Sequence, residues 1–211
     1  MKKMKIFNLD FFENFEKIPD KSVDYTFTSP SYTRKRNNKV QLPYFDFLVK
    51  ATDILLEKTK NWVFLNLHVD NHNRKIVYNY IGQYADKIQN IIICELLNPQ
   101  IPYKMYEVVD TYDMIIILGD KPIKTNSMYS PNHIISSVNP NIYSNIRKEE
   151  MYETVSDQLI TTYTKEKSLI LDPFMGLGTF GVSCKKLDRD FIGFEPNEEF
   201  YMIAEERIKG I

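Results

Sequence analysis

Residues 168–179 have the sequence Ser168-Leu169-Ile170-Leu171-Asp172-Pro173-Phe174-Met175-Gly176-Leu177-Gly178-Thr179, in which an apolar run meets a glycine turn. This pattern is typical of a buried strand that ends in a tight loop before a helix. Gly176 and Gly178 can adopt positive φ and let a ligand approach the backbone. Because open α/β sheets bind ligands outside the carboxyl ends of their strands, the stretch predicts a cofactor pocket with Asp172 at its strand end.

A second acidic residue indicates what the pocket holds. Glu195 ends the predicted strand of residues 190–195 and follows Asp172 by 23 residues, and an acid at roughly that spacing usually binds ribose hydroxyls. The turn is not G-x-G-x-x-G, and the chain contains no G-x-x-x-x-G-K-[ST] phosphate loop. These features favour a cationic or zwitterionic nucleoside, such as S-adenosylmethionine (SAM), over a dinucleotide. The alternative is an ordinary turn without a ligand, and the spacing of Glu195 from Asp172 argues against it.

The composition limits the class of protein. With 211 residues, 43% of them hydrophobic, the chain predicts one domain with a full core, or one domain with a modest insertion. A formal net charge of −1 gives no global signal for nucleic acid, so any basic footprint must be local. Cys94 and Cys184 stand apart in apolar contexts and without metal spacing, which predicts reduced thiols in a cytoplasmic protein that binds no metal. Neither a signal peptide nor a membrane helix is expected.

Strand and helix patterns alternate along the chain and predict a mostly parallel α/β sheet flanked by helices. Residues 121–147 differ, because they are rich in Asn, Ser, Pro and Tyr with little periodicity, and we expect them to be an insertion. We predict strands at residues 3–8, 22–28, 61–67, 88–96, 111–118, 168–172 and 190–195, and helices at residues 11–18, 44–57, 75–84, 149–164, 179–187 and 197–209.

A second motif, Thr28-Ser29-Pro30-Ser31-Tyr32, also follows a predicted strand. Pro30 fixes the loop, and its carbonyl and the Ser29 hydroxyl are hydrogen-bond acceptors. Tyr32 offers a flat aromatic face. Such a pocket suits a planar group with an amino donor, such as an extruded nucleobase. A plain turn before a loop is the alternative.

The two motifs, in this order, resemble those of the β-class DNA amino-methyltransferases, which methylate the exocyclic amino group of adenine or cytosine. The resemblance includes Asn8-Leu9-Asp10 near the start and Lys186 to Glu195 near the end of the chain. It implies a Rossmann-like SAM-dependent methyltransferase fold with a circularly permuted motif order. It also implies a single methyltransferase domain over residues 1–211, with residues 121–147 as a small target-recognition region.

The resemblance assigns a role to each matching position. The methionine side of SAM would be lined by Asp172, Phe174, Gly176, Gly178 and Thr179. Glu195 would bind the ribose, and Asp10 would lie near the adenine of the cofactor. The target base would be held by Ser29, Pro30 and Tyr32. A basic loop follows directly, and we expect it to contact the phosphates of double-stranded DNA through Arg34, Lys35, Arg36 and Lys39.

Other interpretations remain open at this stage. A serine at position 29 favours cytosine N4 over adenine N6 as the target. Ser31 replaces the family's second proline, and residues 149–157 lack a proline-containing form that the family has. An inactive SAM-binding subunit or regulator is therefore one alternative, and a methyltransferase acting on RNA or protein is another. The short insertion is compatible with a homodimer, a separate specificity partner or a very short recognition site.

Overall fold

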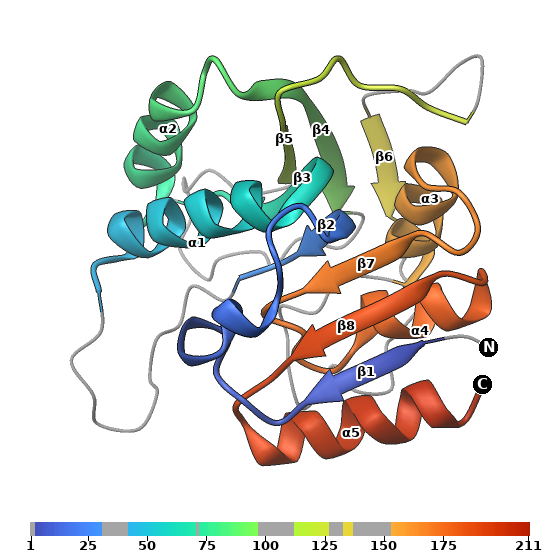
Figure 1. Cartoon of the computed structure of the whole chain (residues 1–211). Helices are drawn as coiled ribbons and strands as arrows, with labels where there is room; N and C mark the ends of the chain where they lie inside the picture. Colours follow the sequence, from blue (N-terminus) through green and yellow to red (C-terminus); the bar gives the residue numbers. More distant parts are fainter. Residues whose placement is uncertain (1–2, 31–41, 71, 97–111, 127–132, 137–152) are drawn as a thin grey trace, which may run out of the picture.

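The computed structural model describes residues 3–30, 42–70, 72–96, 112–126, 133–136 and 153–211. These residues form an eight-stranded sheet in the order β1-β8-β7-β2-β3-β5-β4-β6 (Figure 1). Every strand runs parallel to its neighbours except β5, which is antiparallel to both β3 and β4. The strands are β1 (Met4–Phe7), β2 (Val23–Thr28), β3 (Thr59–His68), β4 (Ile88–Leu96), β5 (Tyr112–Leu118), β6 (His133–Ser136), β7 (Leu169–Asp172) and β8 (Asp190–Phe194).

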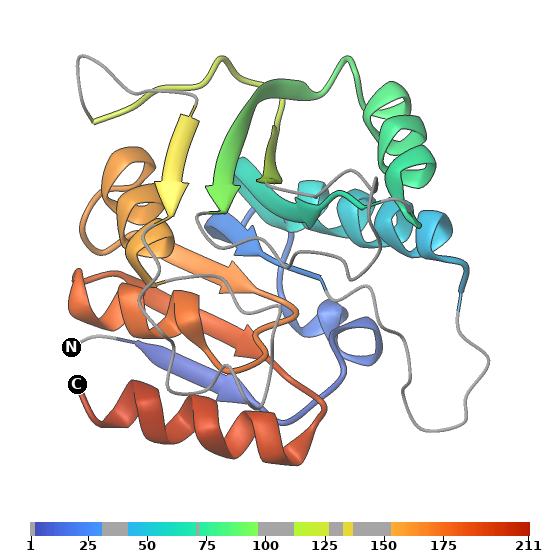
Figure 2. The ribbon, with the colours of Figure 1, turned by 180° about the vertical axis from the view of Figure 1, so that it is seen from behind.

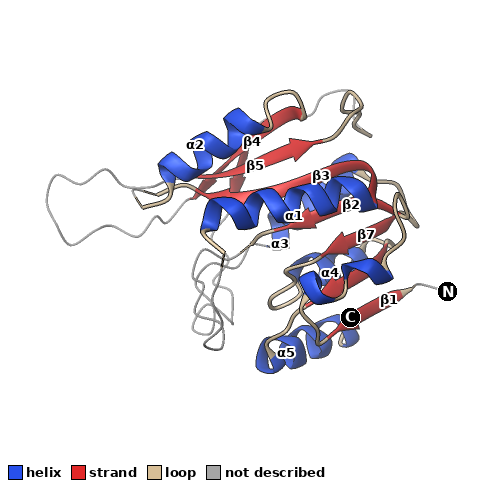
Figure 3. Cartoon of the chain, turned by 60° about the vertical axis from the view of Figure 1, so that its left-hand side comes forward, coloured by secondary structure: helices blue, strands red, loops and turns tan. Residues whose placement is uncertain are grey.

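Helices cover both faces of this sheet. Figure 1 shows α1 in front of the strands, and Figure 2 shows α3 and α4 in front when the molecule is seen from behind. Figure 3 shows α1 running along β3, which it contacts. The helices are α1 (Tyr44–Lys58), α2 (Arg74–Gln83), α3 (Glu153–Tyr163), α4 (Thr179–Lys186) and α5 (Glu198–Lys209). The predicted α/β fold with a mostly parallel sheet flanked by helices is therefore confirmed.

The alternation of side chains along β3 explains why two helical layers are needed. Trp62 and Phe64 pack into the core with α3, α4 and α5, whereas Val63 and Leu65 pack into the core with α1 and α2. All four side chains are buried. A strand that is apolar on both faces is stable only when both faces are covered, because each buried large apolar side chain contributes about 1.5–3 kcal/mol.

The pairing of β2 with β7 brings the two sequence motifs together. Thr26 lies opposite Leu171 in this parallel pair, so the carboxyl ends of the two strands are neighbours. The strand of the second motif comes first in the chain, and the strand of the glycine turn comes later. This arrangement confirms both the expected adjacency of the motifs and the permuted order.

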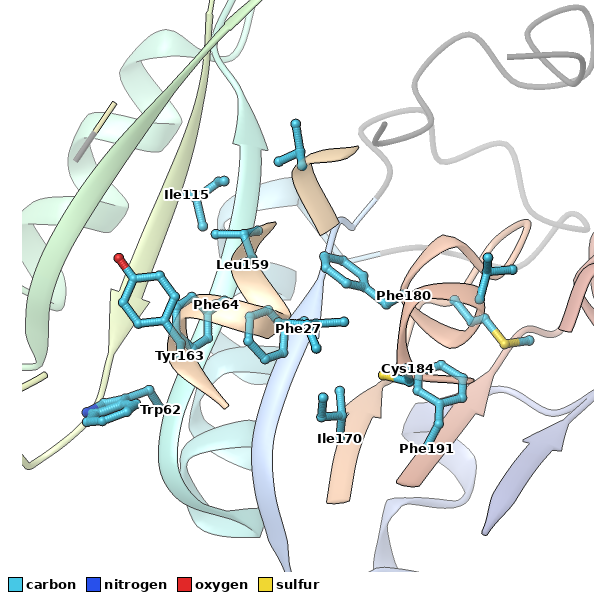
Figure 4. Close-up of a cluster of buried hydrophobic side chains, with 14 of the residues drawn as sticks. Phe27, Trp62, Phe64, Ile115, Leu159, Tyr163, Ile170, Phe180, Cys184 and Phe191 are labelled. Atoms are coloured by element: carbon cyan, nitrogen blue, oxygen red, sulfur yellow. The ribbon is translucent and has the colours of Figure 1, made fainter. Parts of the chain in front are cut away.

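A stacked aromatic pair supports this end of the sheet. The rings of Phe27 and Phe64 lie 4.2 Å apart, centroid to centroid, and nearly parallel. Phe180 from α4 packs against Phe27 at 5.6 Å. Figure 4 shows these three rings in one cluster with Ile170 and Phe191. Because Phe27 immediately precedes Thr28, the cluster anchors the end of β2 on which the second motif depends.

The predicted helix over residues 11–18 is wrong. The chain forms two single 3₁₀ turns there, η1 (Phe11–Glu13) and η2 (Phe15–Lys17). Asn14 between them has φ −135°, which is outside the helical region. Phe11 and Phe12 both pack against Phe174, so tertiary packing of the rings overrides the helical spacing of this segment.

Two other segments depart from the simple pattern. The predicted strand at residues 111–118 is present as β5 but runs antiparallel to its neighbours. Within the expected insertion at residues 121–147, His133–Ser136 form β6, which pairs with β4 at the sheet edge. Residues 121–126 are also described, and the side chain of Asn126 donates to backbone carbonyls at the end of α3. The remaining residues of the insertion lie outside the described part.

Candidate active site

The glycine turn after β7, which we call the cofactor loop (residues 172–179), has the backbone that its sequence predicts. Gly176 has φ 54° and Gly178 has φ 81°, both in the left-handed region that favours glycine. Gly178 directly precedes α4 and is packed against α5, since a Cβ added there would lie 2.9 Å from the Ala204 Cβ. Thr179, the first residue of α4, is buried.

Asp172 joins the cofactor loop to the second motif. Its carboxylate is buried, and its Oδ1 accepts a hydrogen bond of 2.7 Å from the Thr28 hydroxyl and one of 3.1 Å from the Phe174 amide. Thr28 is the last residue of β2 and is itself fully buried. One carboxylate therefore shapes the start of the loop and holds the strand from which Ser29 follows.

Glu195 holds the other side of the cofactor loop. Its Oε2 accepts from the Gly176 amide at 3.0 Å, and its Oε1 accepts from the Asn197 amide at 2.8 Å. Only 2% of the residue is exposed. The Asn8 side chain donates to the Glu195 carbonyl at 2.9 Å, which ties the end of β1 to the same place.

Arg207 is a support of the loop that the sequence did not reveal. Its guanidinium donates to the Leu177 carbonyl at 2.7 Å and to Glu153 at 2.8 Å. The Arg207 side chain is only 6% exposed, so solvent screens this contact less than it would a surface pair. The arginine thus ties α5 and α3 to the loop.

Phenylalanine rings line one side of the loop. The Phe174 ring contacts those of Phe11, Phe12 and Phe47 at centroid distances of 5.2–6.1 Å. Asp10 begins this cluster, because its carboxylate accepts from the Phe12 amide at 2.8 Å and caps η1. The predicted cofactor residues Asp10, Asp172, Phe174, Gly176, Gly178, Thr179 and Glu195 are therefore brought to one edge of the sheet.

The second motif is described only in its first part. Ser29 is half-buried and its Oγ accepts a hydrogen bond of 3.2 Å from the Asn66 side chain, and Pro30 is buried. The other residues predicted to act here lie outside the described part of the chain, namely Tyr32, Arg34, Lys35, Arg36 and Lys39, and so does Ser31.

Three polar residues beside Ser29 were not predicted. Asn66 and His68 stand at the carboxyl end of β3, and Asp113 stands at the adjoining start of β5. The His68 ring nitrogen Nδ1 lies 2.8 Å from an Asp113 carboxylate oxygen. Polar side chains where an apolar strand ends are a signal for a site in an open α/β sheet. The sequence Asn66-Leu67-His68 carries that signal.

The cysteines have no nucleophilic role in the described structure. Both thiols are free and buried. Burial raises the pKa of Cys94 to about 12, and it raises the pKa of Cys184 well above the ordinary thiol value. Both are therefore protonated near neutral pH and are poor nucleophiles.

The described residues contain neither a metal-binding cluster nor a membrane-spanning helix. The described His, Cys, Asp and Glu side chains form no group of three or more that could hold a metal ion. Among the helices in the described part of the chain, none is long and apolar enough to cross a membrane.

Comparison with protein families gives one match that covers most of the chain. The N6/N4 methyltransferase model, described as DNA methylase, matches residues 23–206. Curated relatives match over shorter segments. The type II methyltransferase M2.LlaDCHI of Lactococcus lactis subsp. cremoris is 45% identical over 56 residues, which are 26% of this chain and 21% of that protein. M.SmaI of Serratia marcescens is 56% identical over 39 residues, 18% of this chain and 13% of that protein. The chain thus aligns with about a fifth or less of these relatives.

Solved structures match over nearly the whole length. PvuII DNA methyltransferase, which is cytosine-N4-specific, superposes on this chain with a TM-score of 0.79 at 16% sequence identity. The superposition covers 98% of this chain and 86% of the PvuII chain. The structure of the M1.HpyAVI–SAM complex superposes with a TM-score of 0.69 at 20% sequence identity. The superposition covers 97% of this chain and 98% of the M1.HpyAVI chain. At these identities the likeness establishes the fold.

Proposed function

Because this chain belongs to the DNA methylase family of N6/N4 methyltransferases, we propose that it transfers a methyl group from SAM to the exocyclic amino group of a base flipped out of double-stranded DNA. The observation that carries the proposal is the hydrogen bond of 2.7 Å between Thr28 and Asp172. It joins the strand that leads to Ser29 directly to the carboxylate at the root of the cofactor loop.

The chemistry of the cofactor loop fits SAM. Two acidic side chains hold this loop, Asp172 at its start and Glu195 at the Gly176 amide, and they suit the cationic and hydroxyl groups of this nucleoside better than they suit a pyrophosphate. Gly176 and Gly178 leave the backbone without side chains where the loop turns. We assign the methionine side of SAM to the residues from Asp172 to Thr179, the ribose to Glu195, and the adenine end to the neighbourhood of Asp10. When bound, SAM supplies the methyl group in electrophilic form.

The protein's own part in the reaction is to make the base nitrogen reactive. An exocyclic amino group is a poor nucleophile because its lone pair is conjugated into the ring. The Ser29 hydroxyl oxygen and the Pro30 carbonyl accept hydrogen bonds from this amino group. These hydrogen bonds favour a pyramidal nitrogen, and a pyramidal nitrogen has a lone pair that is free to react. Tyr32 stacks on the flipped base and offsets the lost base stacking. When the amino nitrogen accepts the methyl group, the carbon–sulfur bond of SAM breaks and its electron pair leaves with S-adenosylhomocysteine. The nitrogen releases one proton to water, and no covalent bond to the protein is needed.

We propose cytosine N4 rather than adenine N6 as the target atom. The support is the serine at position 29, since in this family serine at that position is found more often with cytosine enzymes. The structural likeness to a cytosine-N4-specific methyltransferase agrees with this preference. We further propose that Arg34, Lys35, Arg36 and Lys39 bind DNA phosphates, that residues 121–147 contribute to sequence recognition, and that a homodimer or a separate specificity partner completes the DNA-binding surface.

Product analysis tests the reaction. The full chain is incubated with isotopically labelled SAM and unmethylated genomic DNA, RNA or a mixed protein extract, and the products are digested and analysed by mass spectrometry. We expect labelled N4-methyldeoxycytidine from DNA. N6-methyldeoxyadenosine would change the target base but keep the function. Label only in RNA or protein, or SAM binding without transfer, would overturn the proposal.

Substitution at Tyr32 tests the base-holding role. We expect Tyr32→Ala to reduce kcat/KM for DNA by about 5- to 150-fold, because stacking on an aromatic side chain contributes about 1–3 kcal/mol per base. The affinity for SAM, measured by calorimetry, should stay within about twofold of wild type. Tyr32→Phe is the matched control and should keep most of the activity. Equal losses of SAM binding and turnover in Tyr32→Ala would remove this residue from the base site.

A further inference from the structure

Polar side chains interrupt the apolar layer that α3, α4 and α5 cover, at the edge where Ser29 lies. Along β3, Trp62 and Phe64 are buried in this layer, and Asn66 is the next side chain on the same face (Figure 4 labels the two aromatic residues). Asp113 lies on the same face of β5, two residues before Ile115, which pairs with Asn66. The polar group therefore begins where the hydrophobic core ends and the second motif starts.

Hydrogen bonds fix the orientation of the Asn66 carboxamide. Its Nδ2 donates to the Ser29 Oγ at 3.2 Å and to the Asp113 Oδ2 at 3.4 Å. A carboxylate can only accept hydrogen bonds, so the amide nitrogen, and not the amide oxygen, must face Asp113. The other Asp113 oxygen is held by His68 at 2.8 Å. The Asp113–His68 pair thus sets which end of the carboxamide points at Ser29.

The Asn66 oxygen is the unusual atom of this group. Asn66 is 5% exposed, and its Oδ1 is buried without a hydrogen-bond partner among the described residues. A buried acceptor without a donor carries its full desolvation penalty. Unsatisfied groups of this kind are few in native proteins and call for an explanation. A ligand that brings an N–H group to this atom would remove the penalty.

We propose that Asn66 belongs to the site that holds the target base, where its Nδ2 positions the Ser29 hydroxyl and its Oδ1 accepts an N–H of the exocyclic amino group. The inference rests on the proposed DNA methyltransferase function. Because Asn66 donates to the Ser29 oxygen, it occupies one lone pair of that oxygen and fixes the direction of the other. The two hydrogens of the amino group are then shared among three acceptors, at Ser29, Pro30 and Asn66, and these acceptors hold them away from the lone pair that must react.

A purely structural role for Asn66 leads to different expectations. If Asn66 only bridged β2, β3 and β5, its removal would lower the free energy of unfolding and would change all ligand affinities together. A base-holding role predicts that turnover and recognition of the amino group are lost while SAM binding persists. The separation of these quantities is therefore the basis of the test.

The test compares Asn66→Ala with Asn61→Ala in the full chain. Asn61 is the matched control, because it lies on the same strand at the opposite end and its side chain donates to the Asp24 carbonyl. We expect Asn66→Ala to lower kcat by about 5- to 150-fold, the range for loss of one or two hydrogen bonds, with the SAM Kd within about twofold. Asn61→Ala should keep kcat within about twofold. A normal kcat for Asn66→Ala in a protein that methylates DNA would overturn the inference and leave the function standing.

Modified DNA supplies a readout that stability does not affect. Once the recognition site is known from sequencing of methylated DNA, duplexes carry at the target either the natural base or its analogue without the amino group, pyrimidin-2-one for cytosine or purine for adenine. We expect the ratio of affinities for the natural and the analogue duplex to be several-fold lower for Asn66→Ala than for the wild type, because Ser29 and Pro30 keep their share of the preference. An unchanged preference would overturn the inference.

Two further outcomes are informative. If Asn66→Ala fails to fold, Asp113→Asn tests the inference instead. This substitution keeps the shape of the Asp113 side chain but removes the charge that orients the Asn66 carboxamide. We expect Asp113→Asn to reduce kcat by several-fold with SAM binding kept. Full activity of Asp113→Asn would overturn the positioning argument. If the wild-type protein transfers no methyl group to DNA, both this inference and the proposed function fail.

Discussion

The cofactor loop and the second motif lie side by side at one edge of the sheet, but they are supported in different ways. The backbone of the loop is held by Asp172, Glu195 and Arg207, all of which belong to the same continuous segment of the chain. Ser29 is held by Asn66, which comes from another strand and lies outside any motif, and an oxygen of that asparagine has no partner among the described residues. The backbone of the loop is held by hydrogen bonds within the protein, whereas the base site contains a buried acceptor, the Asn66 Oδ1, without a donor among the described residues.

This difference separates two demands on the protein. A loop that binds a cofactor needs a fixed backbone, and hydrogen bonds from buried side chains provide one before the ligand arrives. A site that must change the electronic state of a base nitrogen benefits from acceptors that are satisfied only when the base is present. The predictions below test each side of this comparison.

The largest effect is expected for Gly178→Ala, which attacks the fixed backbone of the loop. The new Cβ would be placed at φ 81° and 2.9 Å from the Ala204 Cβ. We expect the free energy of unfolding to fall by about 2–5 kcal/mol, the sum of left-handed strain and overpacking. Chemical denaturation followed by circular dichroism measures this change, and SAM binding should fall in the protein that remains folded.

Two variants sharpen the Gly178 experiment. Gly82→Ala is the matched control, because Gly82 lies in α2 with nothing within 4 Å of an added Cβ, and it should stabilise the protein by up to about 1 kcal/mol. Adding Ala204→Gly to Gly178→Ala should restore only part of the steric loss. The Ala204 Cα and the Ile208 Cδ1 still lie 3.2 and 3.3 Å from the new Cβ, and a glycine inside α5 itself costs about 1 kcal/mol. Full restoration would show that the left-handed backbone contributes nothing, contrary to the comparison drawn above.

A smaller effect is expected for Thr28→Val, which removes the contact between the two regions. Asp172 would lose a buried donor, and we expect a cost of about 1–3 kcal/mol in stability with a SAM affinity reduced by roughly 5- to 30-fold. Thr26→Val is the control, since Thr26 is equally buried on the same strand but bonds to Thr59, away from the loop. If both variants weakened SAM binding alike, the effect would come from β2 as a whole and not from the Thr28–Asp172 contact.

The same contrast explains how far the sequence could predict the structure. The cofactor loop is encoded locally, so its strand, its positive-φ glycines and its helix followed from consecutive residues. The adjacency of the two motifs also followed, because parallel strands end at the same edge. Asn66 and Asp113 could not be assigned, since their meeting depends on the register of β3 against the antiparallel β5. The 3₁₀ turns of residues 11–17 were missed because ring packing on Phe174 outweighs helical spacing.

The smallest effect concerns the two buried thiols, which both lie in the core layer that α3, α4 and α5 cover. Cys184 lies in α4 behind the cofactor loop, and Cys94 lies in β4. Burial raises both pKa values, that of Cys94 to about 12. We expect alkylation by iodoacetamide at pH 8 to be slow for both, because the thiolate is scarce and local opening is required. Saturating SAM should slow alkylation of Cys184 more than that of Cys94, as mass spectrometry of the labelled peptides can measure.

The raised thiol pKa values also set the sign of a pH effect. A thiol that stays protonated in the folded state but ionises in the unfolded state favours unfolding at high pH. The contribution of these two thiols to stability is therefore complete below the ordinary thiol pKa of 9.0 and declines as the pH rises above it. A Cys94→Ala, Cys184→Ala double variant should show a weaker decline in the melting temperature between pH 8.5 and about pH 10. An identical decline would assign the effect to other groups.

The hydrogen bond between Thr28 and Asp172 has a thermodynamic consequence for the order in which ligands bind. A ligand that stabilises one arrangement of this bond changes the affinity of the other ligand, and linkage requires the two changes to be equal. If SAM tightens DNA binding by a given factor, DNA must tighten SAM binding by the same factor. If S-adenosylhomocysteine tightens DNA binding less than SAM does, its formation shortens the time for which the DNA stays bound. The buried Thr28 hydroxyl would then connect the turnover of one ligand to the residence time of the other.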